Sequence, residues 1–384
     1  MNELKKEDFI KAIRLIFPPI PEDKYIGILV DIPKTQERDN ENWEARRDLA
    51  EDWYYMLKDN CKTLGLEGAL LIAYTEVGSN NADLPQNATV IEKFLPPIAS
   101  KIEAFGESAE FEMLFKNIQL ILAPTEYSTT APLKNAAKEY KFRAATMPGF
   151  SLDMIPAFQI DYDKVHNNVQ LIKYHLDRAV DIDVRFLVDN EKEYKMNFDI
   201  RKKKAHASSG RFPEIGTAGN FPSGEAYIVP YEGGRKAISQ TEGFLPVQFG
   251  DDIVIYEIRE NKVVNVTGEG KPILQEKEHL KREPAYGNMA EVGFGVLGEF
   301  GIKPIGEILL DEKLGFHVAF GRSDHFGGEV GPSDFSSPEE VVHIDRIYIP
   351  SIQPRISVQS VNFVYGNSQS DLIIKNNKYF LDLY

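Results

Sequence analysis

Two residue types that commonly bind metal ions stand two positions apart in the segment V-H-I-D-R-I, as His343 and Asp345. The segment alternates apolar and polar residues, which is typical of a β-strand whose successive side chains point to opposite faces. Both side chains are therefore expected on one face, with about 6 to 7 Å between their Cα atoms. Such a pair can chelate a divalent cation, although an isolated H-x-D on a strand is more often a hydrogen-bonded pair.

A second histidine and a carboxylate precede this pair. The apolar run 308–310 leads into a turn that contains Glu312. In the next segment, 316–320, phenylalanine and valine alternate with His317, which is therefore expected to point away from the apolar face. Imidazole and carboxylate groups gathered in this way suit a borderline divalent ion such as zinc, cobalt or manganese.

Two more glutamates stand beside glycines. Glu225 follows a Pro/Gly turn and opens an apolar segment, so rigid backbone at a strand end is expected to hold its carboxylate. Glu291 is followed by Gly293 and Gly295, which let backbone or a ligand approach closely. Taken alone, the first is more often a surface glutamate at a strand end, and the second is equally well explained as the start of a helix.

The segments that must position these residues have two textures. In the first half, helices are predicted for 7–17, 41–64, 88–105, 132–140 and 161–180, and strands for 25–32, 68–77 and 117–123. Such alternation implies a largely parallel sheet covered on its faces. From residue 182 onward, short alternating segments with glycine-rich turns predict a mostly β half. We therefore expect an α/β protein with an N-terminal α/β domain (1–180) and a mostly β, α+β C-terminal catalytic domain (181–384) that carries the metal site.

Composition excludes several classes of partner. The net charge of −15 disfavours nucleic acid and anionic membranes, because both require a basic surface. No segment approaches the roughly 20 apolar residues of a membrane span, and the N-terminus lacks the pattern of a secretory signal. Cys61 is the single cysteine, which excludes an intrachain disulfide and fits a reducing compartment. A cytoplasmic location is expected.

Taken together, the segments that contain these residues resemble the thermophilic-type metallo-aminopeptidases, the family of aminopeptidase T and aminopeptidase S. The matching stretches follow the family's order and similar spacing between residues 146 and 345, whereas the first 140 residues match only in their α/β texture. They are T-M-P-G-F from Thr146, G-R-F-P-E from Gly210, G-N-F-P-S-G-E from Gly219, E-V-G-F-G from Glu291, I-L-L-D-E-K from Ile308, the following His317, and H-I-D from His343.

The resemblance implies a leucyl-aminopeptidase-like hydrolase that removes N-terminal residues from peptides with a free α-amine. It implies two divalent metal ions and a homodimer. Glu225 or Glu291 would pass a proton from the activated water to the leaving amine. The implied metal ligands, all of which this chain retains, are Glu225, Glu291, Glu312, His317, His343 and Asp345.

The chain departs from the family at one functional position. Family members carry a tyrosine seven residues after the counterpart of His317, a group suited to hydrogen-bond the tetrahedral oxyanion. Asp324 stands there in this chain, and an ionised aspartate cannot donate a hydrogen bond. We expect protonated His325 to supply the hydrogen bond, with Arg322 as the second choice, unless this glycine-rich loop is purely structural. The asparagine usual after the glycines that follow Glu291 is also replaced, by Leu297.

Two other functions fit part of the same motifs. A branch that resembles the dihydroxypyridine dioxygenases shares the scaffold, and His317, His343 and Asp345 could form the two-histidine, one-carboxylate face of a mononuclear iron site. That branch lacks the glutamates that match Glu225 and Glu291, and their presence favours the binuclear hydrolase, because spare buried carboxylates cost free energy without cations. The third function is a non-catalytic relative that binds metal or peptide, for which the Asp324 departure argues.

Overall fold

The computed structural model describes residues 4–234 and 237–383 and divides the chain into two compact units. The first unit comprises Met1–Asp163 and Gly210–Ser223, and the second comprises Lys164–Ser209 and Gly224–Tyr384. The contacts thus divide the chain differently from a single boundary near residue 180. Most of the helix Tyr162–Leu176 belongs to the second unit, and the segment Gly210–Ser223 belongs to the first.

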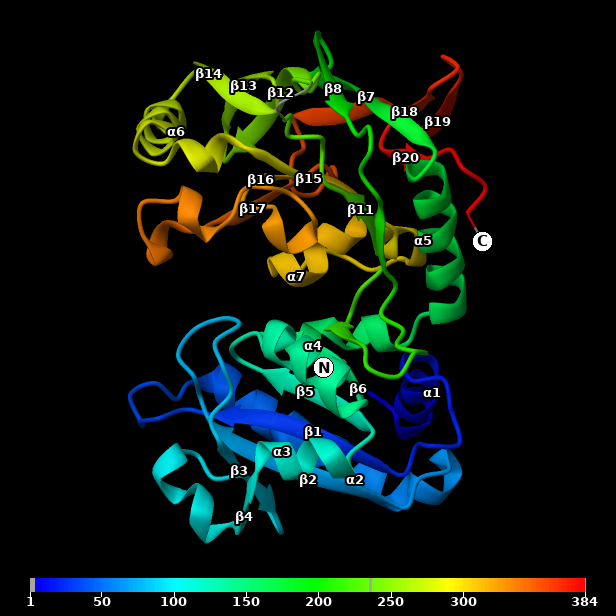
Figure 1. Ribbon diagram of the computed structural model, residues 1–384, viewed down its shortest axis with the longest axis vertical. Coiled ribbons are helices and arrows are strands. Elements are labelled where there is room, and N and C mark those ends of the chain that lie inside the picture. The colour runs from blue at the N-terminus through cyan, green and yellow to red at the C-terminus, as the bar shows by residue number, and fades with distance from the viewer. Residues whose placement is uncertain (1–3, 235–236, 384) are drawn as a thin grey trace. The chain divides into compact units, whose positions relative to one another are not determined.

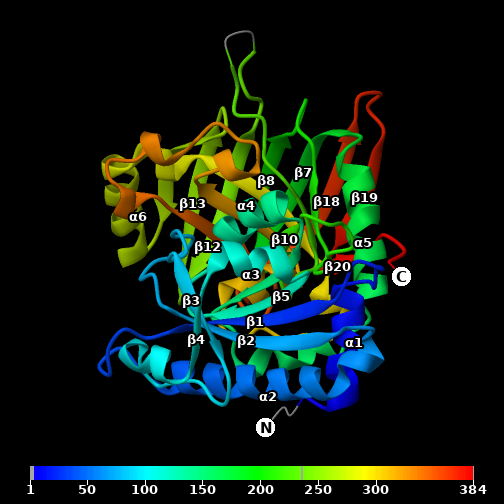
Figure 2. The same ribbon diagram turned by 60° about the horizontal axis from the view of Figure 1, so that its bottom comes forward.

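The first unit is a mixed sheet with helices on both faces (Figures 1 and 2). Its seven strands run in the order β10-β6-β5-β1-β2-β3-β4, in which β10, β6, β5, β1 and β2 are parallel and β3 and β4 are antiparallel. Helix α2 packs on β1 and β2, while α3 and α4 cover the opposite face. The elements are α1 Lys6–Ile16, β1 Tyr25–Ile32, α2 Glu41–Leu64, β2 Gly68–Thr75, β3 Asn87–Ile91, β4 Gly106–Glu110, α3 Phe111–Asn117, β5 Leu120–Thr125, α4 Thr130–Tyr140, β6 Arg143–Pro148 and β10 Ala218–Asn220.

Strand β1 and helix α2 begin and end at the predicted residues. The helix has clear local signals: the Asn40 side chain accepts hydrogen bonds from the backbone N–H groups of Asn42 and Trp43, and Gly65 ends it with a φ of 79°. These caps satisfy backbone groups that the helix itself leaves unpaired. The ends of α2 could be predicted from the sequence for that reason.

The predicted helix over 88–105 is wrong. Strand β3 occupies 87–91 and pairs with β2 and β4, and only a short 3₁₀ helix at Ala99–Ala104 follows. Pro96 and Pro97 stand in the middle of the predicted helix, where a proline removes a hydrogen bond and clashes with the preceding turn. Pairing with β2 then decides the conformation of the apolar residues before them.

The second unit contains two packed sheets (Figure 1). One has five strands in the order β17-β16-β15-β11-β9, and the other has eight in the order β14-β13-β12-β8-β7-β18-β19-β20. The elements are α5 Tyr162–Leu176, β7 Ala179–Val188, β8 Lys192–Asp199, β9 His206–Ser208, β11 Glu225–Ile228, β12 Glu242–Phe249, β13 Asp252–Arg259, β14 Lys262–Gly268, α6 Lys271–Arg282, β15 Met289–Gly295, α7 Ile308–Asp311, β16 Phe316–Gly321, β17 His343–Ile347, β18 Ile356–Tyr365, β19 Ser370–Lys375 and β20 Lys378–Tyr379. The chain is thus an α/β protein with a mostly β second half, as predicted. Among the described residues, no helix is long and apolar enough to cross a membrane.

Aromatic side chains fill the space between the two sheets of the second unit. The ring centroids of Phe186 and Phe316 lie 6.3 Å apart, and those of Phe294 and Phe363 lie 5.1 Å apart. Phe316 and Phe294 project from one face of the five-stranded sheet. Because side chains alternate along a strand, the residues that precede and follow each of these phenylalanines project from the opposite face. We call that opposite face the ligand face.

Candidate metal centre

The register of the five-stranded sheet brings predicted site residues from four strands onto the ligand face. Glu225 on β11 pairs with Gly295 on β15, and Glu291 on β15 pairs with Ala319 on β16. Ala319 in turn pairs with Asp345 on β17. Directly paired residues point to the same face. Strands β11, β15 and β17 therefore present three carboxylates to one face.

The two histidines join the carboxylates on this face. His317 pairs with Gly293, and His343 pairs with Gly321. Glu225 and Glu291 are each only 4 % exposed, and His317 is completely buried. Glu225 is therefore not a surface glutamate, and Glu291 lies within a strand instead of beginning a helix.

Two glycines make room for these side chains. A Cβ atom on Gly293 would lie 1.9 Å from Nε2 of His317, so the imidazole lies directly over the glycine. A Cβ atom on Gly295 would lie 2.2 Å from the backbone carbonyl carbon of Lys313, in the segment that carries Glu312. Both distances are far shorter than any van der Waals contact. The expectation that these glycines permit close approach is confirmed.

One group of three ligand atoms forms around His317. Its Nε2 lies 3.3 Å from Oε1 of Glu291 and 3.5 Å from Oε2 of Glu225. A ligand atom from each of the three residues lies within 4.8 Å of the others, which is close enough to hold one metal ion. Among the residues that the structure describes, Oε2 of Glu225 accepts no hydrogen bond, although it is buried.

A second group forms around His343 and shares Glu291. Nε2 of His343 lies 3.7 Å from the other oxygen of Glu291, Oε2, and 3.8 Å from Oδ1 of Asp345. Within the described residues, this Asp345 oxygen is also buried without a hydrogen bond. Glu291 thus directs one oxygen at each histidine. Each group also contains a buried carboxylate oxygen that lacks a hydrogen-bond donor, and such an oxygen is costly unless a cation approaches it.

Backbone carbonyl groups orient both imidazole rings. Nδ1 of His317 lies 3.1 Å from the carbonyl oxygen of Gly315, and Nδ1 of His343 lies 2.8 Å from that of Arg322. A carbonyl oxygen only accepts, so each Nδ1 carries the proton and donates. Nε2 therefore keeps its lone pair for a metal ion whenever the ring is neutral. This arrangement is usual for histidines that bind metal ions.

Lys313 is a buried part of the site that the motifs did not single out. Its ammonium group donates to Oε1 of Glu225 at 2.6 Å and also to Oε1 of Glu312. The lysine thereby joins Glu312 to the other ligands and leaves Oε2 of Glu225 directed at His317. Its place directly after Glu312 was the only sequence signal. A lysine next to a ligand is more often solvent-exposed, because lysine is rarely buried without a partner.

Burial and neighbouring charges shift the pKa values of the clustered ligands. Burial raises the pKa of Glu225 well above its ordinary range, although the charge of Lys313 opposes the shift. Burial opposes protonation of His317, but the hydrogen bond to Glu291 and the charge of Glu225 raise its pKa. Burial opposes ionisation of Glu291, but the hydrogen bond from His317 and the charge of His343 lower its pKa. Glu225 and His317 thus hold protons that a divalent cation could replace. Its nitrogen and oxygen donors suit zinc, cobalt or manganese.

The loop that carries Asp324, at the position of the expected tyrosine, lies beside this site. The ring of His325 is 5.5 Å from the ring of His343. Asp324 accepts a hydrogen bond from Nε of Arg322 at 2.6 Å and lies 3.5 Å from Nδ1 of His325. Burial, together with the positive charges of His343 and Arg322, lowers the pKa of His325 to about 4. The role of His325 as a hydrogen-bond donor to the substrate stays a prediction.

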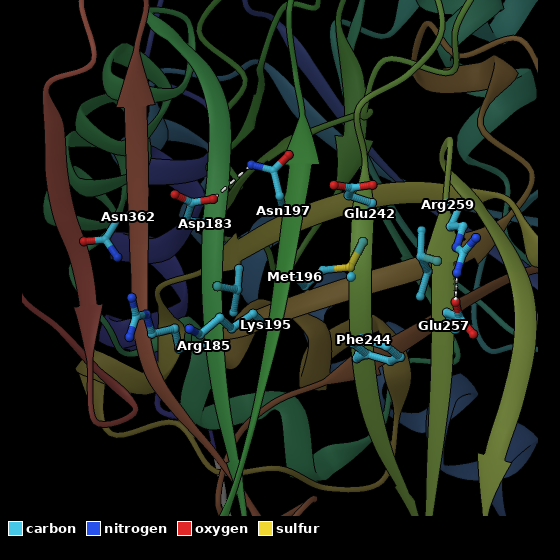
Figure 3. Close-up of a pocket in the computed structure, with 13 residues that line it drawn as sticks. Asp183, Arg185, Lys195, Met196, Asn197, Glu242, Phe244, Glu257, Arg259 and Asn362 are labelled. Atoms are coloured by element: carbon cyan, nitrogen blue, oxygen red, sulfur yellow. Dashed lines mark hydrogen bonds and ion pairs between the residues drawn. The ribbon is translucent and has the colours of Figure 1, made fainter.

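A hollow elsewhere on the second unit is separate from this site (Figure 3). It lies on the outer face of the eight-stranded sheet, where Asp183 accepts a hydrogen bond from Asn197 and Glu257 pairs with Arg259. Among the described residues that line it, none belongs to the six candidate ligands. The candidate ligands lie on the ligand face of the other sheet instead.

No protein-family model and no curated protein matches the sequence. Among solved structures, the chain is similar to 2,5-dihydroxypyridine dioxygenase from Pseudomonas putida KT2440, with a TM-score of 0.59 and 11 % identity over 98 % of this chain and 96 % of that chain. It is also similar to wild-type AmpT (aminopeptidase T) from Thermus thermophilus, with a TM-score of 0.56 and 12 % identity over 98 % of each chain. At such identities the likeness shows a shared fold and does not choose between the two enzymes.

Proposed function

We propose that the protein is a metal-dependent aminopeptidase with two divalent ions, zinc, cobalt or manganese, bound on the ligand face. The observation that carries the proposal is the position of Glu291 between two groups of ligands. Each group has its own histidine, whose Nε2 faces the carboxylates, and its own buried carboxylate oxygen without a hydrogen-bond donor. Glu291 directs one oxygen at each histidine and would therefore hold both ions. A single ion at either group would leave the other group's carboxylate uncompensated.

The chemistry follows from the residues around these positions. Divalent ions, when bound, supply an activated water near neutral pH and polarise the scissile carbonyl group. Glu225 or Glu291 accepts the proton of that water and passes it to the leaving amine. Lys313 keeps Glu225 in place through its hydrogen bond to Oε1. A free α-amine would bind one of the ions or a nearby carboxylate, so substrates are peptides with a free N-terminus. Arg322 and His325 lie beside His343 as candidate hydrogen-bond donors to the substrate.

Elemental analysis tests the metal number. Protein purified without a metal-affinity column and incubated with zinc, cobalt or manganese should retain close to two ions per chain after dialysis. The loaded protein should hydrolyse aminoacyl substrates with a free amine and turn over their N-acetylated forms poorly. A reproducible single iron per chain, or equal turnover of free and blocked peptides, contradicts the proposal.

A mononuclear iron dioxygenase is the second candidate, favoured by the similarity in fold to the dihydroxypyridine dioxygenase. His317, His343 and Asp345 could supply its two-histidine, one-carboxylate face. Glu291 argues against this candidate, because it lies 3.3 Å from one histidine and 3.7 Å from the other and adds a charge that a three-ligand site does not need. Oxygen uptake by the iron-loaded protein with 2,5-dihydroxypyridine decides between the candidates. We also propose a homodimer, which light scattering tests.

A further inference from the structure

Tyr227 lies on the ligand face beside the proposed metal ligands, although no motif singled it out. It follows Glu225 by two positions on β11, so both side chains project from the same face. Tyr227 pairs with Gly293, and Gly293 pairs with His317 on the far side. The glycine between them has no side chain, and the imidazole of His317 lies over it. Tyr227 is therefore the next side chain beyond His317 in this row of the sheet.

Two aromatic side chains hold the ring of Tyr227. His206, its partner on β9, stacks on it with centroids 5.2 Å apart and an interplanar angle of 20°. Phe326 contacts it edge-on at 5.0 Å and lies 5.5 Å from the ring of His343. A hydrogen-bond-length contact of 2.9 Å between Nε2 of His206 and the carbonyl oxygen of Phe326 joins the two supports. These two contacts give the phenol ring a defined orientation.

The hydroxyl group of Tyr227 is available to a substrate. Lys313 engages Glu225 and Glu312, and His317 engages Glu291. Among the described residues, the Tyr227 hydroxyl makes no hydrogen bond. An ordinary phenol already keeps its proton at neutral pH and can donate it.

We propose that Tyr227 is a catalytic residue whose hydroxyl donates a hydrogen bond to the substrate's carbonyl oxygen as that oxygen gains negative charge. The proposal rests on the aminopeptidase function proposed above. Two other donors near the site already have partners: Arg322 pairs with Asp324, and Lys313 bonds two carboxylates. No proton leaves the phenol, so Tyr227 stabilises the tetrahedral intermediate without taking part in proton transfer. Preorganised donors of this kind are worth about 100-fold or more in turnover.

The test is Tyr227→Phe, which removes only the hydroxyl group and keeps the stacked ring. We expect kcat on a free aminoacyl substrate to fall about 100-fold, with metal content and thermal stability unchanged and KM altered little. Tyr174→Phe is the matched control, because Tyr174 lies on α5 with its side chain 57 % exposed and should tolerate the change at full activity. A Tyr227→Phe variant with near-normal kcat overturns the proposal.

A second measurement separates this proposal from the proposed function. Leucine phosphonic acid carries a tetrahedral anionic group that imitates the intermediate, and calorimetry measures its binding to the zinc-loaded protein without catalysis. Weaker binding to Tyr227→Phe than to wild type supports the donor role even if no peptide is hydrolysed. Equal binding to both overturns that role and leaves the aminopeptidase function standing where hydrolysis occurs. If the loaded wild type neither binds the phosphonate nor hydrolyses any peptide, both proposals fail.

Discussion

Replacing Gly293 with alanine should remove His317 from the metal site. The added Cβ atom would lie 1.9 Å from Nε2 of His317, whereas real Cβ contacts are essentially never shorter than 3.0 Å. The imidazole nitrogen must therefore move by at least 1.1 Å, the difference between the two distances. No left-handed backbone conformation is involved at Gly293, so the effect is steric.

The displacement is large for a metal ligand. Metal–ligand distances vary by only about 0.2 Å in well-formed sites. The ring also cannot shift freely, since its Nδ1 donates to the carbonyl oxygen of Gly315 and it lies in the buried row between β15 and β17. We expect metal affinity to fall by at least about 100-fold, the upper end of what losing a mere supporting contact costs. Hydrolysis of aminoacyl substrates should fall with it.

The assay is zinc titration of the dialysed protein by calorimetry, with elemental analysis as a second readout. Gly366→Ala is the control, because a Cβ atom there meets nothing within 4 Å. Circular dichroism and thermal unfolding show whether the variants fold. The double variant Gly293→Ala with His317→Ala separates the steric effect from ligand loss: it relieves the clash, so stability should recover while metal affinity stays low.

The reasoning is refuted if Gly293→Ala binds zinc with wild-type affinity and stoichiometry. That result would mean that the imidazole can leave its place over the glycine without consequence, and that His317 is not a ligand. Recovery of metal affinity in the double variant would also refute the assignment, since that variant has no imidazole at this position.

Three further predictions concern the bridge, the loop and a buried aspartate. Glu291→Gln removes the charge between the two groups, so zinc retained after dialysis should fall from about two ions to fewer than one, with the fold intact by circular dichroism; wild-type metal content would exclude a bridging role. Because Asp324 engages both neighbours, His325→Ala and Arg322→Ala should each lower kcat by less than Tyr227→Phe; a larger fall would assign the donor role to the loop. Burial raises the pKa of Asp31 from 3.8 to about 7, so the folded state holds this proton more tightly than the unfolded state and loses stability as pH rises between these values. Each pKa unit corresponds to about 1.36 kcal/mol, so the full shift lowers the free energy of unfolding by about 4 kcal/mol. Urea unfolding at pH 5 and 7.5, with chelator present, should show a smaller loss for Asp31→Asn than for wild type, and parallel pH profiles would disprove the link.

Local signals in the sequence determined those parts of the fold whose causes are local. Helix α2 carries its own caps at Asn40 and Gly65, and β1 is an apolar run bounded by polar residues, so both were predicted to the residue. Alternation along β16 and β17 placed His317, His343 and Asp345 on polar faces. The residue types of the candidate ligands already indicated a site for a divalent cation.

The failed helix over 88–105 shows where local signals end. Its first residues, 88–91, have an apolar content that fits either a helix or a strand, and pairing with β2 on one side and β4 on the other selects the strand. Such partners lie far away in sequence, so propensity alone cannot identify them.

Only the tertiary structure decided which side chains meet. Alternation along each strand predicts which neighbours share a face with Glu225, Glu291 or Asp345. Only the pairing of β11, β15, β16 and β17 places the three carboxylates on the same face of the sheet. A shift of one residue in any pairing would send a ligand to the opposite side of the sheet. The burial of Lys313 against Glu225 and the place of Tyr227 beyond Gly293 also depend on this register. Register is set by long-range packing and hydrogen bonding between strands, which the order of residues along one strand does not contain.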